Sequence, residues 1–355
     1  MLKNYKYSSV VTTLAFMSKR VLITGISGSI GVHLMHHIFK NTNWEVVGIA
    51  TYKHKGIAER ITEMMEEHPE NWSRLTLITH DLNKPFTKAV KDRIGRVDYI
   101  LNLASLSDVE ASIQDPVPFL QNNISLMYTM LEYAREVKPD VFIQFSTDEV
   151  YGPSGKDQRF AEWSPIVPSN PYSASKAAQE AIAIAYWRSY GVPVIITNTM
   201  NNFGEFQQSS KYPVIIQRAV AESKTLTVHG SEGSIGTRYY IHSRNAADAI
   251  LHILKKLPPY LHKDGEVDKP DRYNIVGDEQ VDNLSLAKLI ANLMNKTLRY
   301  ELQDVHKNRP GHDRHYGLDG SLLKKKGWKS PLSFKESLKK TIEWQTAHPH
   351  WIEND

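Results

Sequence analysis

The sequence contains no cysteine in its 355 residues. Disulfide bonds and thiolate metal sites are therefore excluded, and a reducing compartment, the cytoplasm, is the expected location. The sequence also lacks any apolar run close to the roughly 18 residues that cross a membrane, so we expect no membrane partner. The formal net charge is only +4. A charge this small argues against nucleic acid as a partner, although it suits a modestly anionic ligand.

The first residues form a separate segment. Lys3 and Lys6 precede an apolar stretch that is short, is interrupted by threonines and has no small-residue cleavage site. It is therefore a poor signal peptide. Met17 stands directly before the first predicted strand. We interpret residues 1–16 as an N-terminal extension of unknown role.

Strands and helices alternate over the first 200 residues. Apolar, β-branched runs predict strands, and amphipathic periodicity predicts helices between them. The predicted strands lie at 20–24, 44–49, 75–78, 97–104, 141–145 and 192–198, and the predicted helices follow residue 31 and lie at 57–67, 115–137 and 171–190. This alternation indicates an α/β fold, a Rossmann-type doubly wound parallel sheet. We assign residues 17–200 to this domain.

Residues 201–355 have a more mixed pattern and are predicted to form a smaller C-terminal α/β domain that binds the substrate. Within it, residues 238–257 are expected to return to the first domain. A Pro-, Gly- and charge-rich passage at 258–272 is predicted to be a loop. The other predicted elements are helices at 212–223, 244–257, 284–294 and 334–344 and strands at 226–229, 273–276 and 297–302.

Three glycines, Gly25, Gly28 and Gly31, lie between the first strand and the first helix. Glycine at these positions permits a tight turn and lets the backbone approach a pyrophosphate at the helix N-terminus. The alternative is a tight turn without a ligand. The strand–loop–helix context favours a dinucleotide site, so residues 17–200 are interpreted as a dinucleotide-binding domain.

The end of the second strand lacks the acidic residue that normally holds the adenosine ribose. It reads Ala50-Thr51-Tyr52, followed by Lys53 and Lys55. Two lysines would favour the 2′-phosphate of NADP, unless they are only solvated loop charges. The sequence therefore leaves NAD and NADP open. Asp81, after the third strand, is a candidate adenine contact.

Two hydroxyls and two carboxylates follow the fifth strand, in the order Ser146-Thr147-Asp148-Glu149. The carboxyl ends of strands in open α/β sheets face the ligand crevice, so these side chains are expected to meet there. A lone string of this kind is also typical of a capped turn. Tyr172 and Lys176 follow at helical spacing, four residues apart on one face. A lysine ammonium together with a cationic nicotinamide could lower the pKa of the phenol enough to make it a usable base.

Together these motifs resemble the extended short-chain dehydrogenase/reductase superfamily. The matching residues are the glycine loop, Asp81-Leu82, Leu103-Ala104, Ser146-Thr147, Tyr172 and Lys176. Within this superfamily, Ser146-Thr147-Asp148-Glu149-Val150-Tyr151-Gly152 resembles the dTDP-glucose 4,6-dehydratases, as do Asn201-Asn202-Phe203-Gly204 and residues 309–314. The resemblance covers roughly residues 18–346. The sequence departs from the family pattern at Ala50, at 105–110, at Tyr239-Tyr240 and at Arg244-Asn245, which leaves the cofactor phosphate and the sugar nucleotide open.

The resemblance implies a nucleotide-sugar 4,6-dehydratase in which Tyr172 is the base for C4 oxidation. Lys176 would lower the phenol pKa, Thr147 would bond the 4-oxygen, Glu149 would take the C5 proton and Asp148 would protonate the departing 6-hydroxyl. The first substrate to expect is dTDP-glucose. Dehydratases of UDP-glucose or UDP-N-acetylglucosamine, an epimerase or decarboxylase of the same fold and a non-catalytic nucleotide-sensing module remain as alternatives.

The resemblance also implies the binding residues and a homodimer. The implied contacts of the recycled NAD or NADP are Gly25, Ser27, Gly28, Ser29, Ile30, Gly31, Thr51, Lys53, Asp81, Leu82, Leu103, Ala104, Ser105, Tyr172 and Lys176. The implied substrate contacts are Ser107, Asn123, Asn201, Asn202, Arg238, Arg309 and His312, with the two arginines on the diphosphate. No metal is expected, because His33, His36 and His37 share a helix but lack the glutamate that a metalloprotease motif needs.

Overall fold

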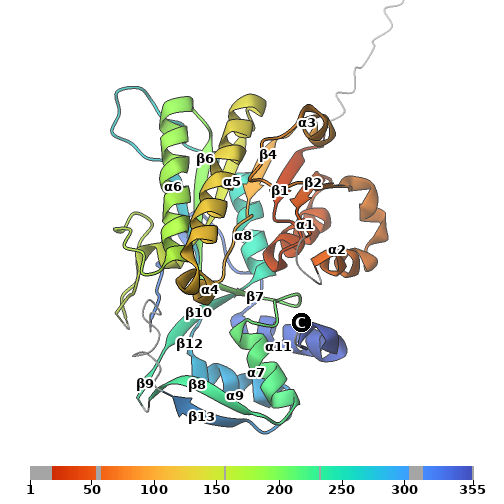
Figure 1. Ribbon diagram of the computed structural model, residues 1–355, viewed down its shortest axis with the longest axis vertical. Helices are drawn as coiled ribbons and strands as arrows, with labels where there is room; N and C mark the ends of the chain where they lie inside the picture. The colour runs from red at the N-terminus through yellow and green to blue at the C-terminus, as the bar shows by residue number, and fades with distance from the viewer. Residues whose placement is uncertain (1–17, 53–56, 156, 232, 304–314, 354–355) are drawn as a thin grey trace, which may run out of the picture.

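A parallel sheet of seven strands forms the larger part of the molecule (Figure 1). The computed structural model describes residues 18–353 except 53–56, 156, 232 and 304–314. The strands lie in the order β11-β6-β5-β4-β1-β2-β3. Their bounds are β1 (Arg20–Thr24), β2 (Glu45–Ala50), β3 (Leu75–Thr79), β4 (Tyr99–Asn102), β5 (Val141–Thr147), β6 (Val194–Thr199) and β11 (Asp271–Ile275). The predicted Rossmann-type sheet is confirmed.

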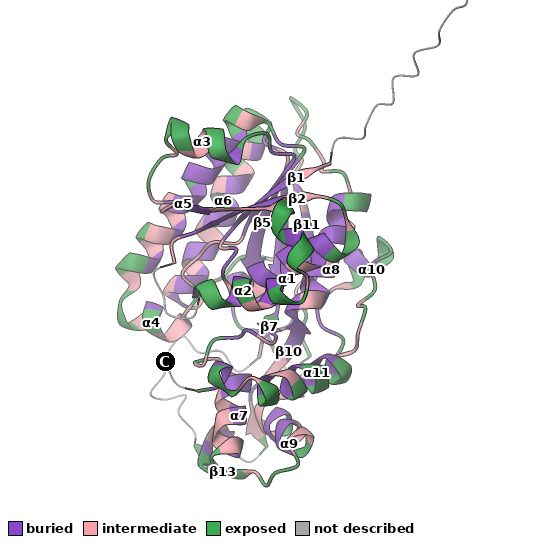
Figure 2. Ribbon diagram, turned by 90° about the vertical axis from the view of Figure 1, so that its right-hand side faces the viewer, coloured by how far each residue is buried: buried purple, intermediate pink, exposed green. Residues whose placement is uncertain are grey.

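Alternation along the strands creates two cores, one on each face of this sheet. In β1, Val21 and Ile23 pack on one face and Leu22 packs on the other, because successive side chains of a strand point to opposite sides. Figure 2 shows the sheet between two helical layers. One layer holds α1 (Ser29–Asn41), α2 (Ile57–Glu66) and α8 (Ser243–Lys256), and the other holds α5 (Pro116–Val137) and α6 (Pro171–Tyr190).

Two small sheets and three helices form the second part of the molecule, at the bottom of Figure 1. Phe203, Leu226, Ile290 and Leu338 belong to its apolar core. Its strands are β7 (Asn201–Phe203), β8 (Thr225–Ser231), β9 (Ser234–Ile235), β10 (Thr237–His242), β12 (Gln280–Asp282) and β13 (Arg299–Gln303), and its helices are α7 (Tyr212–Ala221), α9 (Asn283–Leu293) and α11 (Phe334–Ala347).

The remaining helices are short. They are α3 (Lys88–Ile94), α4 (Val109–Gln114), α10 (Ser321–Lys325) and the 3₁₀ turns η1 (Pro69–Arg74), η2 (Asp148–Tyr151) and η3 (Pro349–Trp351). The sequence pattern missed α3, α4, α10, β7, β10 and β12, because elements of three to seven residues carry too little periodicity to detect. No helix of the described residues is long and apolar enough to cross a membrane.

The chain crosses between the two parts several times. Within 238–257, β10 lies in a small sheet, whereas α8 packs against α1 on the large sheet. The strand predicted at 273–276 was assigned to the smaller domain, but β11 pairs with β6 in the large sheet. The division of the chain at residue 200 stays a prediction, and residues 1–16 lie outside the described part.

Candidate active site

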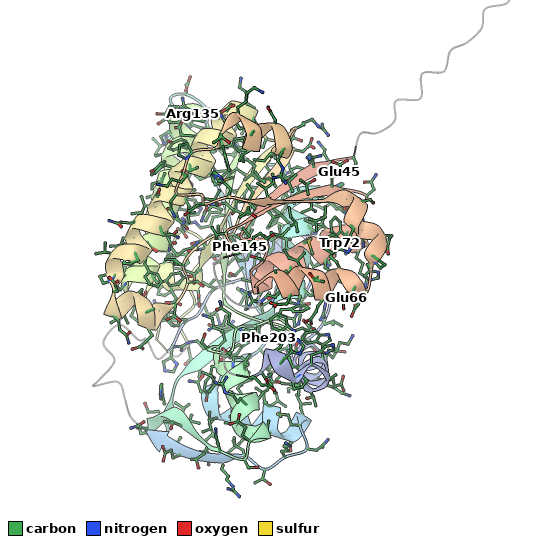
Figure 3. The ribbon with its side chains drawn as sticks, turned by 45° about the vertical axis from the view of Figure 1, so that its right-hand side comes forward. Glu45, Glu66, Trp72, Arg135, Phe145 and Phe203 are labelled. Carbon is green, nitrogen blue, oxygen red and sulfur yellow. The ribbon has the colours of Figure 1, made fainter. Side chains whose placement is uncertain are left out.

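A cleft of about 670 Å³ opens at the carboxyl ends of the large sheet and extends to β7 and α7 of the smaller part. Phe145, near the end of β5, belongs to the large sheet. Phe203 of β7, which lies below it in Figure 3, belongs to the smaller part. Most of the predicted site residues line this cleft. They are Gly25, Ser27, Gly28, Ser29, Ile30, Gly31, Thr51, Asp81, Leu82, Leu103, Ala104, Ser105, Ser107, Thr147, Asp148, Glu149, Tyr172, Lys176, Asn201 and Asn202.

The glycine loop brings backbone close to backbone. Gly25 has φ +68°, which favours glycine. A Cβ on Gly31 would lie 2.5 Å from the carbonyl oxygen of Gly25, so only hydrogen fits there. Gly28 caps α1 without a side-chain hydrogen bond, so no side chain of the cap competes for the amides at this N-terminus. A helix N-terminus of this kind at the cleft is suited to an anion such as a pyrophosphate.

We expect Gly31→Ala to weaken dinucleotide binding at least about tenfold and to lower the free energy of unfolding by about 1–3 kcal/mol. The added methyl collides with the carbonyl oxygens of Gly25 and Ile26 and pushes α1 away from the loop. Titration with dinucleotide and thermal denaturation measure the two effects. Gly155→Ala is the matched control, because its Cβ would make only ordinary contacts. Equal behaviour of the two variants would contradict the assigned role.

The end of β2 carries no acidic residue in its described part, which runs to Tyr52. Thr51 lines the cleft there, and Lys53 lies outside the described residues. The sequence missed Arg60 of α2, which is buried, lines the same end of the cleft and donates a hydrogen bond to the carbonyl oxygen of Ser27. Arg60 lies ten residues after the end of β2, so no local motif points to it. Only the packing of α2 against the glycine loop shows that it reaches the cleft.

The carboxyl end of β5 presents Thr147, Asp148 and Glu149 to the cleft. The Thr147 hydroxyl donates to the Asp148 carboxylate at 3.0 Å and accepts from the Glu149 amide. Ser146, by contrast, turns its hydroxyl to Glu180 on α6. All four residues line the cleft, as expected, although the Ser146 hydroxyl donates its hydrogen bond to this buried carboxylate.

The two adjacent carboxylates have different surroundings. Asp148 is buried, and its Oδ2 has no hydrogen-bond partner among the described residues. Burial, together with the negative charge of Glu149, raises the pKa of Asp148 to about 7. Glu149 instead accepts a hydrogen bond from the Asn170 amide at 3.1 Å. Near neutral pH Asp148 is thus partly protonated and able to donate a proton, which is how neighbouring carboxyls divide acid and base roles.

Tyr172 and Lys176 lie in the first turns of α6. Asn170 caps this helix through a capping box with Ser173, and Pro171 occupies its first position. Lys176 is buried and donates to the carbonyl oxygen of Phe145 and to Gln179, both at 2.7 Å. Burial lowers the pKa of Lys176 to about 8.

In the chain alone, the surroundings of Tyr172 raise its pKa. Burial raises the pKa of Tyr172, and the charges of Glu149 and Asp148 raise it further, while a hydrogen bond with Thr147 lowers it. Lys176 and a cationic nicotinamide together were expected to lower this pKa, and in the chain alone the Lys176 ammonium donates to Phe145 and Gln179. A base at Tyr172 therefore needs positive charge from a bound ligand.

The predicted substrate contacts divide into three groups. Ser107, Asn201 and Asn202 line the cleft. Asn123 does not, which corrects its assignment as a substrate contact: its buried amide bonds the backbone of Leu106 and the Ser175 hydroxyl. It therefore anchors the loop after β4. Arg309 and His312 lie outside the described residues.

Arg238 also stands outside the cleft lining. Its guanidinium packs over the Tyr316 ring, 4.6 Å from the centroid, and donates to the Thr237 carbonyl oxygen. Its charge still reaches Asp148, whose pKa it lowers slightly against the larger effect of burial. Lys211 and Tyr212, at the start of α7, line the cleft but were missed. The signal was a lysine directly before a predicted helix in the second half of the chain.

A cluster of side chains that could bind a metal ion is formed by His33, Glu205 and His242. Their nitrogen and oxygen atoms lie within 4.8 Å of one another. His33 Nδ1 lies 2.6 Å from the Ser29 carbonyl oxygen, and His242 Nδ1 accepts the Arg244 amide. The other nitrogen of His242 then carries a proton and donates to Glu205, which lies 3.0 Å away. A protonated nitrogen cannot bind a metal. Despite its burial, the pKa of Glu205 lies well below its usual range because His242 and His33 bond it.

One family model and several sequence relatives match nearly the whole of this chain. The family model of GDP-mannose 4,6 dehydratase matches residues 22–341. The dTDP-glucose 4,6-dehydratase of Salmonella typhimurium is 31% identical, over 94% of this chain and 95% of the relative. That of Neisseria meningitidis is 30% identical, over 95% of this chain and 96% of the relative.

Solved structures agree with the sequence relatives. The dTDP-glucose 4,6-dehydratase of Bacillus anthracis in complex with NAD has a TM-score of 0.77 and 27% identity, and the match covers 94% of this chain and 98% of that one. The enzyme of the same name from Streptomyces venezuelae, with NAD and TYD bound, has a TM-score of 0.79 and 26% identity over the same shares. The two bound structures match nearly the whole of this chain.

Proposed function

Because the chain belongs to the GDP-mannose 4,6 dehydratase family, we propose that it is an NDP-hexose 4,6-dehydratase acting on dTDP-glucose. The product is dTDP-4-keto-6-deoxyglucose, formed by oxidation at C4, loss of water across C5 and C6 and reduction at C6. The observation that carries the proposal is the pair Asp148 and Glu149 in one cleft with Tyr172 and Lys176. An epimerase of this fold would leave the buried acid Asp148 without a task.

NAD is the proposed cofactor, since the B. anthracis and S. venezuelae relatives hold it. The glycine loop fits its pyrophosphate, because Gly28 leaves the N-terminus of α1 without a capping side chain and Gly31 lets this helix pack close to the loop, where a Cβ would collide with the Gly25 carbonyl oxygen. When bound, the dinucleotide supplies a hydride acceptor for C4, a hydride donor for C6 and positive charge beside Tyr172. Mass spectrometry of the dinucleotide released from the purified protein distinguishes NAD from NADP.

The residues of the chain supply the proton transfers. Tyr172 removes the proton of the sugar 4-hydroxyl. Thr147, which forms hydrogen bonds with Asp148 and Tyr172, holds the 4-oxygen. A ketone at C4 acidifies the proton on C5, so oxidation comes first. Glu149 then takes this C5 proton, while Asp148, with its raised pKa, protonates the departing 6-hydroxyl. Lys176, which lines the cleft, would hold the ribose of the bound dinucleotide.

The diphosphate of the substrate is proposed to lie toward the smaller part of the molecule. Lys211 lines that end of the cleft, directly before the N-terminus of α7. An ammonium and a helix N-terminus both favour phosphate oxygens. Arg309 and Arg238 remain the proposed guanidinium contacts, the first beyond the described residues. The sugar is proposed to lie between the two parts, near Ser107 and Asn201.

The reaction in deuterated water tests this function. We expect dTDP-glucose to give a 4-keto-6-deoxy product with deuterium at C5, because Glu149 exchanges the proton it removes before the proton returns. Mass spectrometry and proton NMR of the product measure the label. A 4-epimer that has lost no water would identify an epimerase, and a missing product with every nucleotide sugar tried would identify a binding protein. UDP-glucose and UDP-N-acetylglucosamine serve as the competing substrates.

We also propose a homodimer formed through α5 and α6. Val117, Tyr128 and Tyr190 of these helices are large apolar or aromatic side chains that remain exposed in the single chain. We propose that these side chains contribute to an apolar interface, as exposed apolar patches often do. A cytoplasmic location stays a prediction. Light scattering of the purified protein measures the oligomeric state.

A further inference from the structure

The strand end that carries the site is held from behind by a fully buried ion pair. Glu180 of α6 and Arg272 of β11 both have a side-chain exposure of 0%, and Arg272 Nη2 lies 2.8 Å from Glu180 Oε2. Neither residue lines the cleft. Isolating two charges from water is costly, and a buried pair often adds little to stability. A role beyond stability is therefore worth seeking.

Glu180 bonds the two strands that end at the site. Its Oε1 accepts from the Ser146 hydroxyl and from the Asn198 amide, the latter at 2.8 Å. The same Asn198 amide donates to the Thr147 carbonyl oxygen at 3.0 Å. The residues directly before Asp148 are thus fixed through their backbone and side chains to one carboxylate.

Arg272 fixes the other side of the same turn. Its Nη1 donates to the Tyr151 hydroxyl at 3.2 Å, at the end of η2. Its guanidinium also packs 4.2 Å from the centre of the Trp163 ring. The Tyr151 hydroxyl in turn donates to the Glu162 carbonyl oxygen. The ion pair therefore fixes η2 at both ends: Glu180 bonds Ser146 just before it, and Arg272 bonds Tyr151 at its end. Asp148 and Glu149 lie between these two contacts.

Glu180 also acts on Lys176, one helical turn before it on α6. Lys176 contacts β5 through the Phe145 carbonyl oxygen and α6 through Gln179, both uncharged. Tyr172 lies on the same helix, and Asp148 and Glu149 of η2 line the cleft beside it. Burial lowers the pKa of Lys176, and the negative charge of Glu180 raises it by a smaller amount.

We propose that Glu180 and Arg272 are positioning residues: together they hold the turn of Asp148 and Glu149 in place, and Glu180 places a buried negative charge one helical turn from Lys176. This inference rests on the proposed function for its effect on turnover, but its effect on Lys176 is independent of the reaction. Glu180→Gln removes this negative charge and leaves the Arg272 charge unbalanced. The double variant Glu180→Gln/Arg272→Met removes both charges and keeps the packing volume.

The test measures the pKa of Lys176 by carbon-13 NMR titration of the lysine Cε, with the resonance assigned from Lys176→Arg. We expect the pKa of Lys176 to fall by about one unit in Glu180→Gln and to fall less in the double variant. Thermal stability should drop in the single variant and recover in the double. Turnover should drop at least about tenfold in the single variant, with part of the loss recovered at lower pH.

The control is Glu132→Gln on α5, an exposed carboxylate that bonds Tyr186 of α6. It should leave the Lys176 titration unchanged. An identical Lys176 pKa in wild type, Glu180→Gln and the double variant would overturn the proposal and leave the pair a packing element only. Absence of dehydration by the wild-type protein would instead refute the proposed function, while the NMR result would still stand.

Discussion

Tyr172→Phe is expected to lower kcat for dehydration by roughly 10³-fold, the range measured for loss of a positioned general base. The phenol is buried at the first turn of α6, and its hydroxyl is the group able to take the 4-hydroxyl proton. The ring remains in the variant, so packing is retained and KM should change little. Initial rates of product formation from dTDP-glucose measure the loss.

The same change on the same helix provides the control. Tyr186→Phe removes a hydroxyl that donates to Glu132 at the surface, far from the cleft lining. We expect its rate to stay within about twofold of wild type, since surface hydrogen bonds contribute little. Tyr172→Phe with a rate near that of the control would show that another group removes the proton. Glu149 and Asp148 would then be the candidates.

Periodicity predicts the sheet well because both faces of each central strand are covered. Every residue of β5 is buried, so its sequence shows an apolar run, interrupted only by Gln144, that leads to a polar end. Periodicity missed β10, and it predicted β11 as a strand but not its place in the large sheet. β10 joins a small sheet beside β7, and β11 pairs with β6 across some 75 residues of chain. Nothing local in either segment specifies its partner strand, so only the folded chain reveals it.

In the site as well, short local motifs could be predicted from the sequence, whereas contacts between distant segments could not. The glycine loop, Asp148-Glu149 and Tyr172 with Lys176 are short motifs, and the structure brings them to one cleft. Ser146 and Asn123 carry equally polar side chains, but the Ser146 hydroxyl donates to Glu180 and the Asn123 amide bonds the Leu106 backbone. Arg60 reaches the cleft only because α2 packs over the loop. The sequence shows which side chains have suitable chemistry, but their direction depends on distant contacts.

Asp148→Asn is expected to stop dehydration after C4 oxidation. Asparagine has nearly the shape of a protonated aspartic acid, the form that a pKa of about 7 makes available near neutral pH. Substrate binding and the step at Tyr172 should therefore persist, whereas the 6-hydroxyl loses its proton donor. We expect product formation to fall at least about 10²-fold, while absorbance of reduced nicotinamide appears on mixing with dTDP-glucose. Stopped-flow absorbance and product analysis separate the two steps.

Glu149→Gln should behave in the same way, because without a base the C5 proton is retained even though the 4-ketone has acidified it. Asp108→Asn is the matched control: Asp108 lines the same cleft and caps α4 through its side chain, and asparagine caps equally well. It should keep both steps. If Asp148→Asn lost C4 oxidation and elimination by the same factor, the acid would act on binding or on Tyr172 rather than on the departing hydroxyl. The two adjacent carboxylates would then share one role, and the argument for dehydration over epimerisation would lose its main support.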